Sequence, residues 1–228
     1  CLWVDLEWSW DEKYAEALGV DIDTLDLIQE RFAETALDLI HGGLEEKEYD
    51  LVVMDSVGGI LPRQEAEKES GGKVIGGQAK LVAVFCRKVI PLLAMNNTAL
   101  IALNHEFTDI MFGNLKTSGG AKLEYHKSIW LRLQKTGKVL AQGETKVGEM
   151  IKASIRKNKL APTVKQEVDL TMMFGKGFSA DHDQFEEELE AGIITKIGNK
   201  YFRGETVLGV GREKAVAALK SLTNPIQH

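Results

Sequence analysis

The chain has 228 residues, 44% of them hydrophobic, which is enough for one core and a small appended domain. No apolar run approaches the ~20 residues that span a bilayer, no signal-peptide pattern opens the chain, and two cysteines are too few for a disulfide scaffold, so we expect a cytoplasmic protein that makes no membrane contact. The net charge of −6 argues weakly against a nucleic-acid partner.

The first two thirds of the chain alternate short apolar runs with helical patterns. Strands are predicted at 1–7, 25–29, 50–55 and 98–104. Helices are predicted at 11–19, at 30–43, where two glycines should end the helix, and at 76–97, where Pro91 should kink or divide it. This alternation predicts an α/β core with a mostly parallel sheet, whose ligands sit at the carboxyl ends of the strands.

The pattern changes near residue 127. Three strands with alternating or mixed faces are predicted at 128–137, 148–159 and 166–177, joined by glycine-containing turns. From about residue 181 a compact tail follows, with helices at 183–192 and 212–222 and short strands between them. We therefore expect a core domain at 1–175 and a small α+β domain at 176–228.

Charge is strongly segregated along the chain. Residues 1–70 carry 19 acidic and 5 basic side chains, a balance of −14, whereas residues 116–165 carry 12 basic and 3 acidic ones, a balance of +9. A polyanion responds to this local balance rather than to the total. The alternative is that the basic segment is a solvated face or packs on the acidic half.

Two stretches, 69–77 and 105–120, are long, rich in glycine and placed just after predicted strand ends. Loops of this length in a compact domain are usually functional or disordered. We expect both to emerge from the same edge of the sheet.

Acidic and polar residues follow the predicted strands at that edge. Asp55 ends the apolar strand at 50–55, which is a Walker-B-like arrangement for holding Mg²⁺, although acids also cap many strands without binding a metal. Glu7 ends the first strand, so that one acid could position magnesium while the other activates water. Asn104 and His105 end the strand at 98–104 and could sense a γ-phosphate.

Several short motifs occur in a fixed order along nearly the whole chain: VDLEW, DEKYAEALGVDIDTL, LVVMDSVGGILP, ALN, MFGN, TSGGAKLEY, RKNKLAP and FGKGF. In these motifs the chain resembles the RecA family of recombinases. The resemblance implies a RecA-like P-loop NTPase core with a mostly parallel twisted sheet and a small C-terminal α+β domain. It also implies a DNA-dependent ATPase that uses ATP and Mg²⁺. Such a protein assembles as a homo-oligomeric helical filament on single-stranded DNA. It then engages duplex DNA for homologous pairing and strand exchange in recombination, repair and the SOS response.

The resemblance assigns roles at the nucleotide. Glu7 matches the catalytic glutamate, and Asp55 with Ser56 matches the Walker B position. Asp11 and Tyr14 match residues that meet the adenine. Lys157 and Lys159 match a lysine pair that reaches into the neighbouring subunit's nucleotide, as an arginine finger supplied in trans does.

The resemblance also assigns residues to DNA. Segments 67–75 and 105–120 correspond to two loops that hold single-stranded DNA, and basic residues on the helix after the first loop lie near it. The implied DNA-binding set is Lys73, Lys80, Arg87, Met111, Phe112, Gly113, Asn114, Lys116, Gly119 and Gly120.

Some positions depart from the cellular RecA pattern. His105 stands where those proteins have glutamine and looks like phage UvsX-type recombinases, and a histidine could make the switch sensitive to pH. The second loop is about three residues shorter than the cellular pattern. Glu124 replaces a basic interface residue, and Trp8 replaces the histidine after the catalytic glutamate.

The phosphate-binding motif G-x-x-x-x-G-K-[ST] does not occur in the 228 residues. In the family it precedes the strand that here begins at Cys1. The chain is then expected to be a fragment of a longer protein, a split recombinase in which a second polypeptide supplies the loop, or an ATPase-dead module that binds DNA or caps a filament. A RecA-fold hexameric helicase is the alternative enzyme.

Overall fold

The structure, a computed structural model, describes residues 1–67, 76–108, 113, 115–162 and 166–223. The chain divides into two compact units, Cys1–Lys127 and Ser128–His228. The division coincides with the predicted change of pattern near residue 127. The predicted domains 1–175 and 176–228 are a different partition and stay a prediction.

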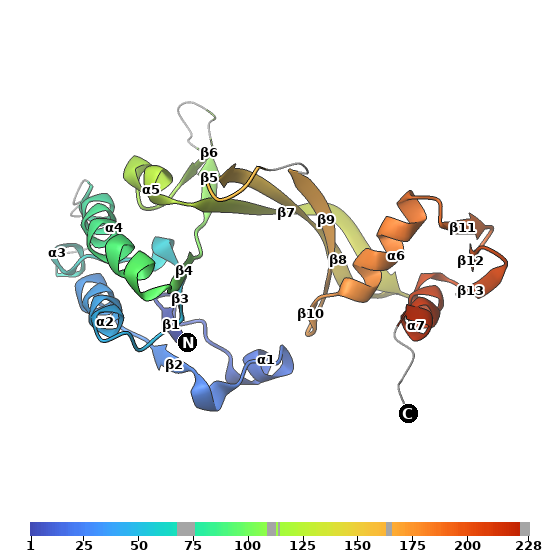
Figure 1. The fold of residues 1–228 in the computed structure, drawn as a ribbon, viewed down its shortest axis with the longest axis horizontal. Coiled ribbons are helices and arrows are strands. Elements are labelled where there is room, and N and C mark those ends of the chain that lie inside the picture. Colours follow the sequence, from blue (N-terminus) through green and yellow to red (C-terminus); the bar gives the residue numbers. More distant parts are fainter. Residues whose placement is uncertain (68–75, 109–112, 114, 163–165, 224–228) are drawn as a thin grey trace. The chain divides into compact units, whose positions relative to one another are not determined.

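The first unit contains a parallel four-stranded sheet in the order β2-β1-β3-β4 (Figure 1). Its strands are β1 (Leu2–Asp5), β2 (Asp26–Ile28), β3 (Leu51–Asp55) and β4 (Ala99–Ala102). Its helices are α1 (Glu12–Ala17), α2 (Ala33–Glu45), α3 (Arg63–Ala66), α4 (Gly77–Asn96) and α5 (Ala121–His126), with 3-10 turns η1 (Ile22–Thr24) and η2 (Val57–Gly59). The parallel α/β architecture confirms the predicted α/β core, whereas its P-loop NTPase details and the C-terminal α+β domain stay predictions.

The core of this unit lies between the sheet and two helices. In Figure 1, α2 and α4 run side by side next to the strands. Val4 and Val52 of the sheet, Ile40 of α2 and Val89 of α4 are all completely buried in one apolar cluster. Burial of these side chains holds the carboxyl ends of β1 and β3 in place.

The prediction that two glycines end the second helix is wrong, because α2 continues through Gly42 and Gly43 to Glu45. A Cβ at Gly43 would lie 2.6 Å from the Tyr49 ring carbon Cε2. Gly43 therefore serves close packing inside the helix rather than its termination.

The prediction that Pro91 divides the long helix is also wrong, because α4 runs without interruption from Gly77 to Asn96, while the alternative, a kink at Pro91, stays a prediction. Pro91 and Arg87, whose carbonyl would otherwise accept the missing N–H, are both exposed. Water can satisfy that carbonyl, which makes the proline tolerable at this position.

The strand predicted at 98–104 forms as β4, but its apolar run, which is typical of a buried strand, is largely exposed. β4 is an edge strand that pairs with β3, and Ile101 is 52% exposed. Among the described residues no strand covers its other side.

The glycine-rich segment 105–120 contains structure that the sequence did not predict. An antiparallel ribbon, β5 (Glu106–Thr108) and β6 (Leu115–Thr117), forms its base. The tip of this segment and most of the segment 69–77 lie outside the described residues.

The second unit begins with an antiparallel sheet in the order β10-β9-β8-β7. Its strands are β7 (Ile129–Gln142), β8 (Thr145–Asn158), β9 (Glu167–Met173) and β10 (Gly177–Phe178). The β7–β8 hairpin is longer than predicted, since both strands extend to the turn at Gly143, which adopts φ +65.

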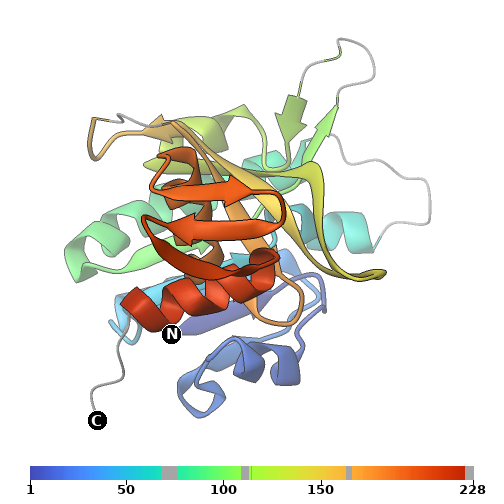
Figure 2. The same ribbon diagram turned by 90° about the vertical axis from the view of Figure 1, so that its right-hand side faces the viewer.

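The C-terminal part of this unit has a small core of its own. It consists of α6 (Ala180–Glu190), the antiparallel strands β11 (Ile194–Ile197), β12 (Lys200–Arg203) and β13 (Thr206–Val210), and α7 (Arg212–Thr223). Figure 2 shows these strands side by side with α7 along them. Phe185, Ile194 and Leu219 are buried together there, and the predicted elements of the tail are confirmed.

No helix in the described part of the chain combines the length and apolarity that crossing a membrane requires.

Candidate functional site

The carboxyl ends of β1, β3 and β4 form the centre of the candidate site. The parallel register places Asp5 beside Asp55. Beyond the strands the alignment continues, since Val57 N donates to Leu103 O at 2.9 Å. β1 ends at Asp5 rather than at Glu7, so Glu7 lies in the turn that follows the strand.

Glu7 forms the hub of this edge. Its Oε1 accepts hydrogen bonds from Ser56 Oγ and from His105 Nε2, the latter at 2.9 Å. These bonds, with the Ser56 bond contributing most, lower the pKa of Glu7 below its ordinary value. Glu7 is therefore a carboxylate at neutral pH, as an acceptor of protons must be.

Asp55 differs from Glu7 in its electrostatics. Burial raises the pKa of Asp55, and repulsion from Glu7 and Asp5 raises it further, while His105 opposes this. An ionised Asp55 is thus stabilised by a nearby cation. The donor chemistry fits Mg²⁺, which binds proteins through one or two carboxylates and completes its shell with water and phosphate. Among the described residues no group of three or more His, Cys, Asp or Glu side chains could enclose a metal, so Asp55 would hold the ion with few protein ligands.

Asn104 links this cluster to the ribbon. Its Nδ2 donates to Ser118 O at 2.9 Å, and its Oδ1 accepts from His105 N at 2.9 Å. Because Ser118 follows β6 and His105 precedes β5, Asn104 ties the two ends of the ribbon segment together. A displacement of His105 from Glu7 would therefore shift both ends of the ribbon segment.

Asp11 and Tyr14, the residues predicted to meet the adenine, lie at the start of α1. Asp11 caps this helix, since its Oδ1 accepts from Tyr14 N at 3.0 Å. The Tyr14 side chain is 46% exposed. An aromatic face in this position is open to stacking.

A hollow of about 410 Å³ lies between α4 and the start of α5. It is lined by Lys80 and Arg87 of α4, by Gly119 and Gly120, and by Lys122 of α5. Lys80 and Arg87 are seven residues apart and therefore lie on one face of the helix. Three cations thus surround an open cavity, which is the electrostatic requirement for an anion site.

Two glycines make the close approach of α5 to α4 possible. Gly119 and Gly120 adopt φ +87 and +77. A Cβ on Gly120 would lie 2.7 Å from Ala79 Cβ, and one on Gly119 would lie 2.9 Å from Val57 Cγ1. Both the backbone conformation and the packing require glycine here.

The other predicted DNA residues are only partly described. Gly113 has φ +67, and Lys116 is an exposed residue of β6 paired with Phe107. Lys73, Met111, Phe112 and Asn114 lie outside the described residues.

Lys157 and Lys159 belong to the second unit. Lys157 lies in β8 opposite Trp130, and Lys159 N donates to Ser128 O at 2.9 Å. The adjacent Asn158 shapes the turn, since its Oδ1 accepts from Leu160 N at 2.9 Å. The pair is therefore carried by the end of a long strand.

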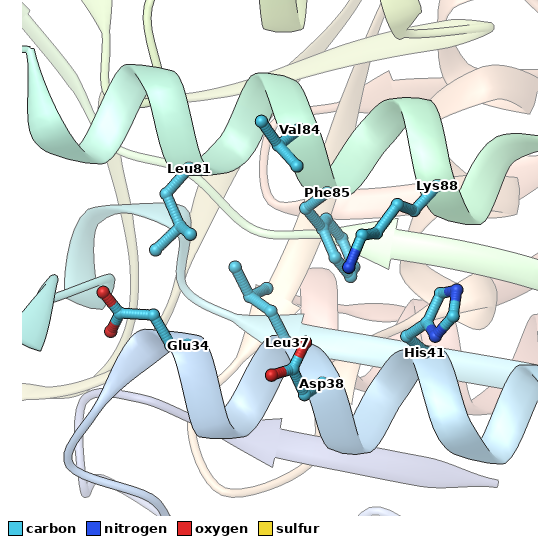
Figure 3. Close-up of a pocket in the computed structure, with 8 residues that line it drawn as sticks. All are labelled: Glu34, Leu37, Asp38, His41, Leu81, Val84, Phe85 and Lys88. Atoms are coloured by element: carbon cyan, nitrogen blue, oxygen red, sulfur yellow. The ribbon is translucent and has the colours of Figure 1, made fainter.

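A second, smaller hollow of about 90 Å³ lies between α2 and α4. Figure 3 shows Leu81 and Phe85 of α4 pointing toward Leu37 of α2. Lys88 also lines this hollow. It contains none of the predicted site residues.

Two residues escaped the sequence analysis. Lys122 lines the cationic hollow, and only the facing of α5 toward α4 reveals this. Asp5 is completely buried and binds the backbone of Glu7. Its sequence signal was an acid inside an otherwise apolar run.

Comparison with known proteins identifies the family of this chain. The sequence model for the RecA N-terminal domain matches residues 1–179. The chain belongs to the RecA family. The match covers the first unit, which contains the parallel sheet, and the antiparallel strands β7 to β10 that follow it in the chain.

Several bacterial relatives of this RecA-family chain span most of it. "Protein RecA" of Aquifex pyrophilus is 37% identical over 217 residues, covering 94% of this chain and 62% of the relative. The Thermus aquaticus protein of the same name is 36% identical over 220 residues, covering 95% and 64%. That of Borrelia hermsii is 35% identical over 231 residues, covering 98% and 65%. The chain thus spans less than two thirds of the length of these relatives.

Proposed function

We propose that this chain acts in a DNA-dependent ATPase that forms a filament on single-stranded DNA and promotes strand exchange in recombination and repair. The observation that carries the proposal is the cluster of Glu7, Ser56 and His105 beside Asp55, in a chain of the RecA family. Its cytoplasmic location, its link to the SOS response and its phage UvsX-type origin stay predictions.

At the nucleotide, Asp55 and Ser56 would bind Mg²⁺, and this ion would neutralise charge on the ATP phosphates. Glu7 accepts a proton from the attacking water. Both of its hydrogen bonds fall on Oε1, so Oε2 is the oxygen that meets the water. Asp11 and Tyr14 receive the adenine, and Asn104 and His105 respond to the γ-phosphate.

The DNA would lie against the hollow between α4 and α5. Lys80, Arg87 and Lys122 bind phosphates, and the backbone at Gly119 and Gly120 allows the strand to approach closely. Contacts to phosphates carry no sequence information, so binding is largely independent of base sequence and sensitive to salt. Duplex DNA joins the assembly after the single strand.

The assembly is a homo-oligomer in which each subunit completes its neighbour's site. Lys157 and Lys159 would stabilise the charge that develops on the phosphate bound to the adjacent protomer. Their position at the end of β8, in the basic part of the chain, supports this role.

The proposal is tested with a labelled oligothymidine and electron microscopy. With the protein as its natural source supplies it, together with any polypeptide that carries the phosphate-binding loop, we expect anisotropy to report tighter binding with Mg²⁺ and a slowly hydrolysed ATP analogue, and micrographs to show helical filaments. Closed rings would instead identify a hexameric helicase. DNA affinity indifferent to nucleotide would identify an ATPase-dead binding or capping module, and no DNA affinity at all would overturn the proposal.

The source of the phosphate-binding segment is tested separately. The intact mass of the protein from its natural source is compared with the 25.2 kDa of this chain. A larger mass supports a longer polypeptide. An equal mass, with nucleotide response restored by a co-purifying protein, supports a second polypeptide.

A further inference from the structure

Asp5 is a charged residue in the apolar core of the first unit. It is the last residue of β1 and its exposed fraction is 0%. An ionised carboxylate removed from water is costly unless it is well paired or hydrogen-bonded. The buried Asp5 carboxylate therefore requires hydrogen bonds that compensate for its removal from water.

The carboxylate of Asp5 accepts hydrogen bonds from several N–H groups, and the backbone of Ser9 is among those that lower its pKa. Its Oδ1 accepts from Glu7 N at 3.1 Å, and its Oδ2 accepts from Trp10 N and from Gln29 Nε2, both at 2.9 Å. Burial raises the pKa of Asp5, but these hydrogen bonds together outweigh burial, and its pKa lies below the ordinary value. The residue is thus held as a carboxylate by the turn that it binds.

That turn carries Glu7. Leu6 N donates to Asp55 O at 2.6 Å, which keeps the chain beside β3 up to this point. Asp5 then binds the amides on both sides of Trp8, a bulky residue in the left-handed region with φ +57. Such a conformation is unfavourable for a bulky residue without outside support.

The result is a sharp division of side chains. Trp8 is directed outward and is 61% exposed, while Trp3 and Trp10 pack with their ring centroids 5.3 Å apart. Glu7 is directed to Ser56 and His105.

We infer that Asp5 is the positioning residue for Glu7: by binding the Glu7 and Trp10 amides it fixes the turn that aims the Glu7 carboxylate at Ser56 and His105. Asp5 acts through the backbone and does not touch the reacting atoms. The inference rests on the proposed role of Glu7, but its readouts follow the turn itself and require neither nucleotide nor DNA.

The decisive variant is Asp5→Asn, which keeps the size of the side chain and replaces one acceptor oxygen by an NH2 group. The readout is the pKa of the Glu7 carboxyl group, followed by carbon NMR across a pH titration. The charged groups that act on Glu7 are His105, Asp5 and Asp55.

The sign of the change separates two explanations. The negative charge of Asp5 raises the pKa of Glu7, so removal of charge alone would lower it further. Loss of the bonds to Ser56 and His105 would raise it toward the ordinary value of 4.5. We expect a rise, together with roughly tenfold faster exchange of the Glu7 and Trp10 amide hydrogens, because a bond to a charged group is lost. A fall or no change in the pKa of Glu7 would overturn the inference.

Two further variants distinguish a specific effect on the Glu7 turn from a general loss of stability. Ile40→Val removes a methyl group from the apolar core of the first unit and lowers stability modestly without touching the turn, so the pKa of Glu7 should not move. Gln29→Ala removes one donor from Asp5 but leaves both amide bonds, and we expect a smaller rise in the pKa of Glu7. A shift with Ile40→Val as large as with Asp5→Asn would reduce Asp5 to a residue of general stability.

This result is independent of the proposed function. The NMR readouts need neither ATP nor DNA, so a positive result with no nucleotide response in the filament experiment would refute the ATPase and leave the positioning role standing. A nucleotide response with an unmoved Glu7 would refute only the positioning role.

Discussion

Removing the three cations of the hollow between α4 and α5 should change how DNA binding responds to salt. The variant is Lys80→Ala, Arg87→Ala and Lys122→Ala combined, which leaves the glycines and the apolar floor intact. Each phosphate neutralised on a single strand contributes about 0.7 to the slope of log affinity against log salt. Three contacts therefore account for a slope of about 2.

This slope has a large effect on affinity. Between 50 and 200 mM salt the concentration rises fourfold, so a slope of about 2 corresponds to roughly a 20-fold loss of affinity. Over this salt range, the DNA affinity of the original chain should therefore fall roughly 20-fold more than that of the triple variant. The measurement is the anisotropy of a labelled oligothymidine at five or more salt concentrations.

Lys88→Ala is the matched control. Lys88 is an exposed neighbour of Arg87 on α4, but it lines the hollow toward α2 (Figure 3). Its removal changes the net charge without touching the proposed phosphate site, so the slope should stay close to that of the original chain. An unchanged slope in the triple variant, or an equal change with Lys88→Ala, would refute the assignment of the hollow to phosphates.

Three further predictions concern stability. Burial, and then repulsion from neighbouring acids, raises the pKa of Asp55 in the folded state above its ordinary value of 3.8. The folded protein therefore loses stability as pH rises above 3.8, because Asp55 ionises more readily in the unfolded chain. In calorimetry, Asp55→Asn should raise Tm at pH 7 and give no gain in Tm below pH 3.8. In Gly120→Ala the new Cβ would lie 2.7 Å from Ala79 Cβ at a residue with φ +77, and the free energy of unfolding in urea should fall by about 2–3 kcal/mol. The control Gly137→Ala should cost less, because Gly137 has φ +82 but no atom lies within 4 Å of a Cβ there. Phe185→Ala empties a fully buried position of the C-terminal core and should cost about 3–5 kcal/mol of that unit's stability, measured by amide hydrogen exchange.

The sequence predicted the elements of the first unit well because buried parallel strands and amphipathic helices leave regular patterns. Those patterns also located the carboxyl edge, and the structure brings Glu7, Ser56 and His105 together there. The catalytic and binding roles of these residues stay predictions.

The errors arose where packing against other parts of the fold, rather than the local sequence pattern, decides the structure. Gly43 looked like a helix end until the Tyr49 ring was seen to pack against it. Ile101 looked like a core residue because its strand is apolar, yet burial depends on what covers the edge of the sheet. Lys122 gave no signal at all, since its contribution depends on how α5 faces α4.

The contrast between Asp5 and Asp55 shows what the sequence could not distinguish. Both acids end apolar strands, and the parallel register places them side by side. Yet the pKa of Asp5 is lowered and that of Asp55 is raised, and the described residues supply N–H donors to the first while no hydrogen bond counters burial at the second. The backbone turn therefore compensates the charge of Asp5 within the protein, whereas the charge of Asp55 calls for an external cation. Two identical side chains at one sheet edge thus differ in how their charge is compensated, which is why the proposed anchor for Glu7 and the proposed magnesium ligand are different residues.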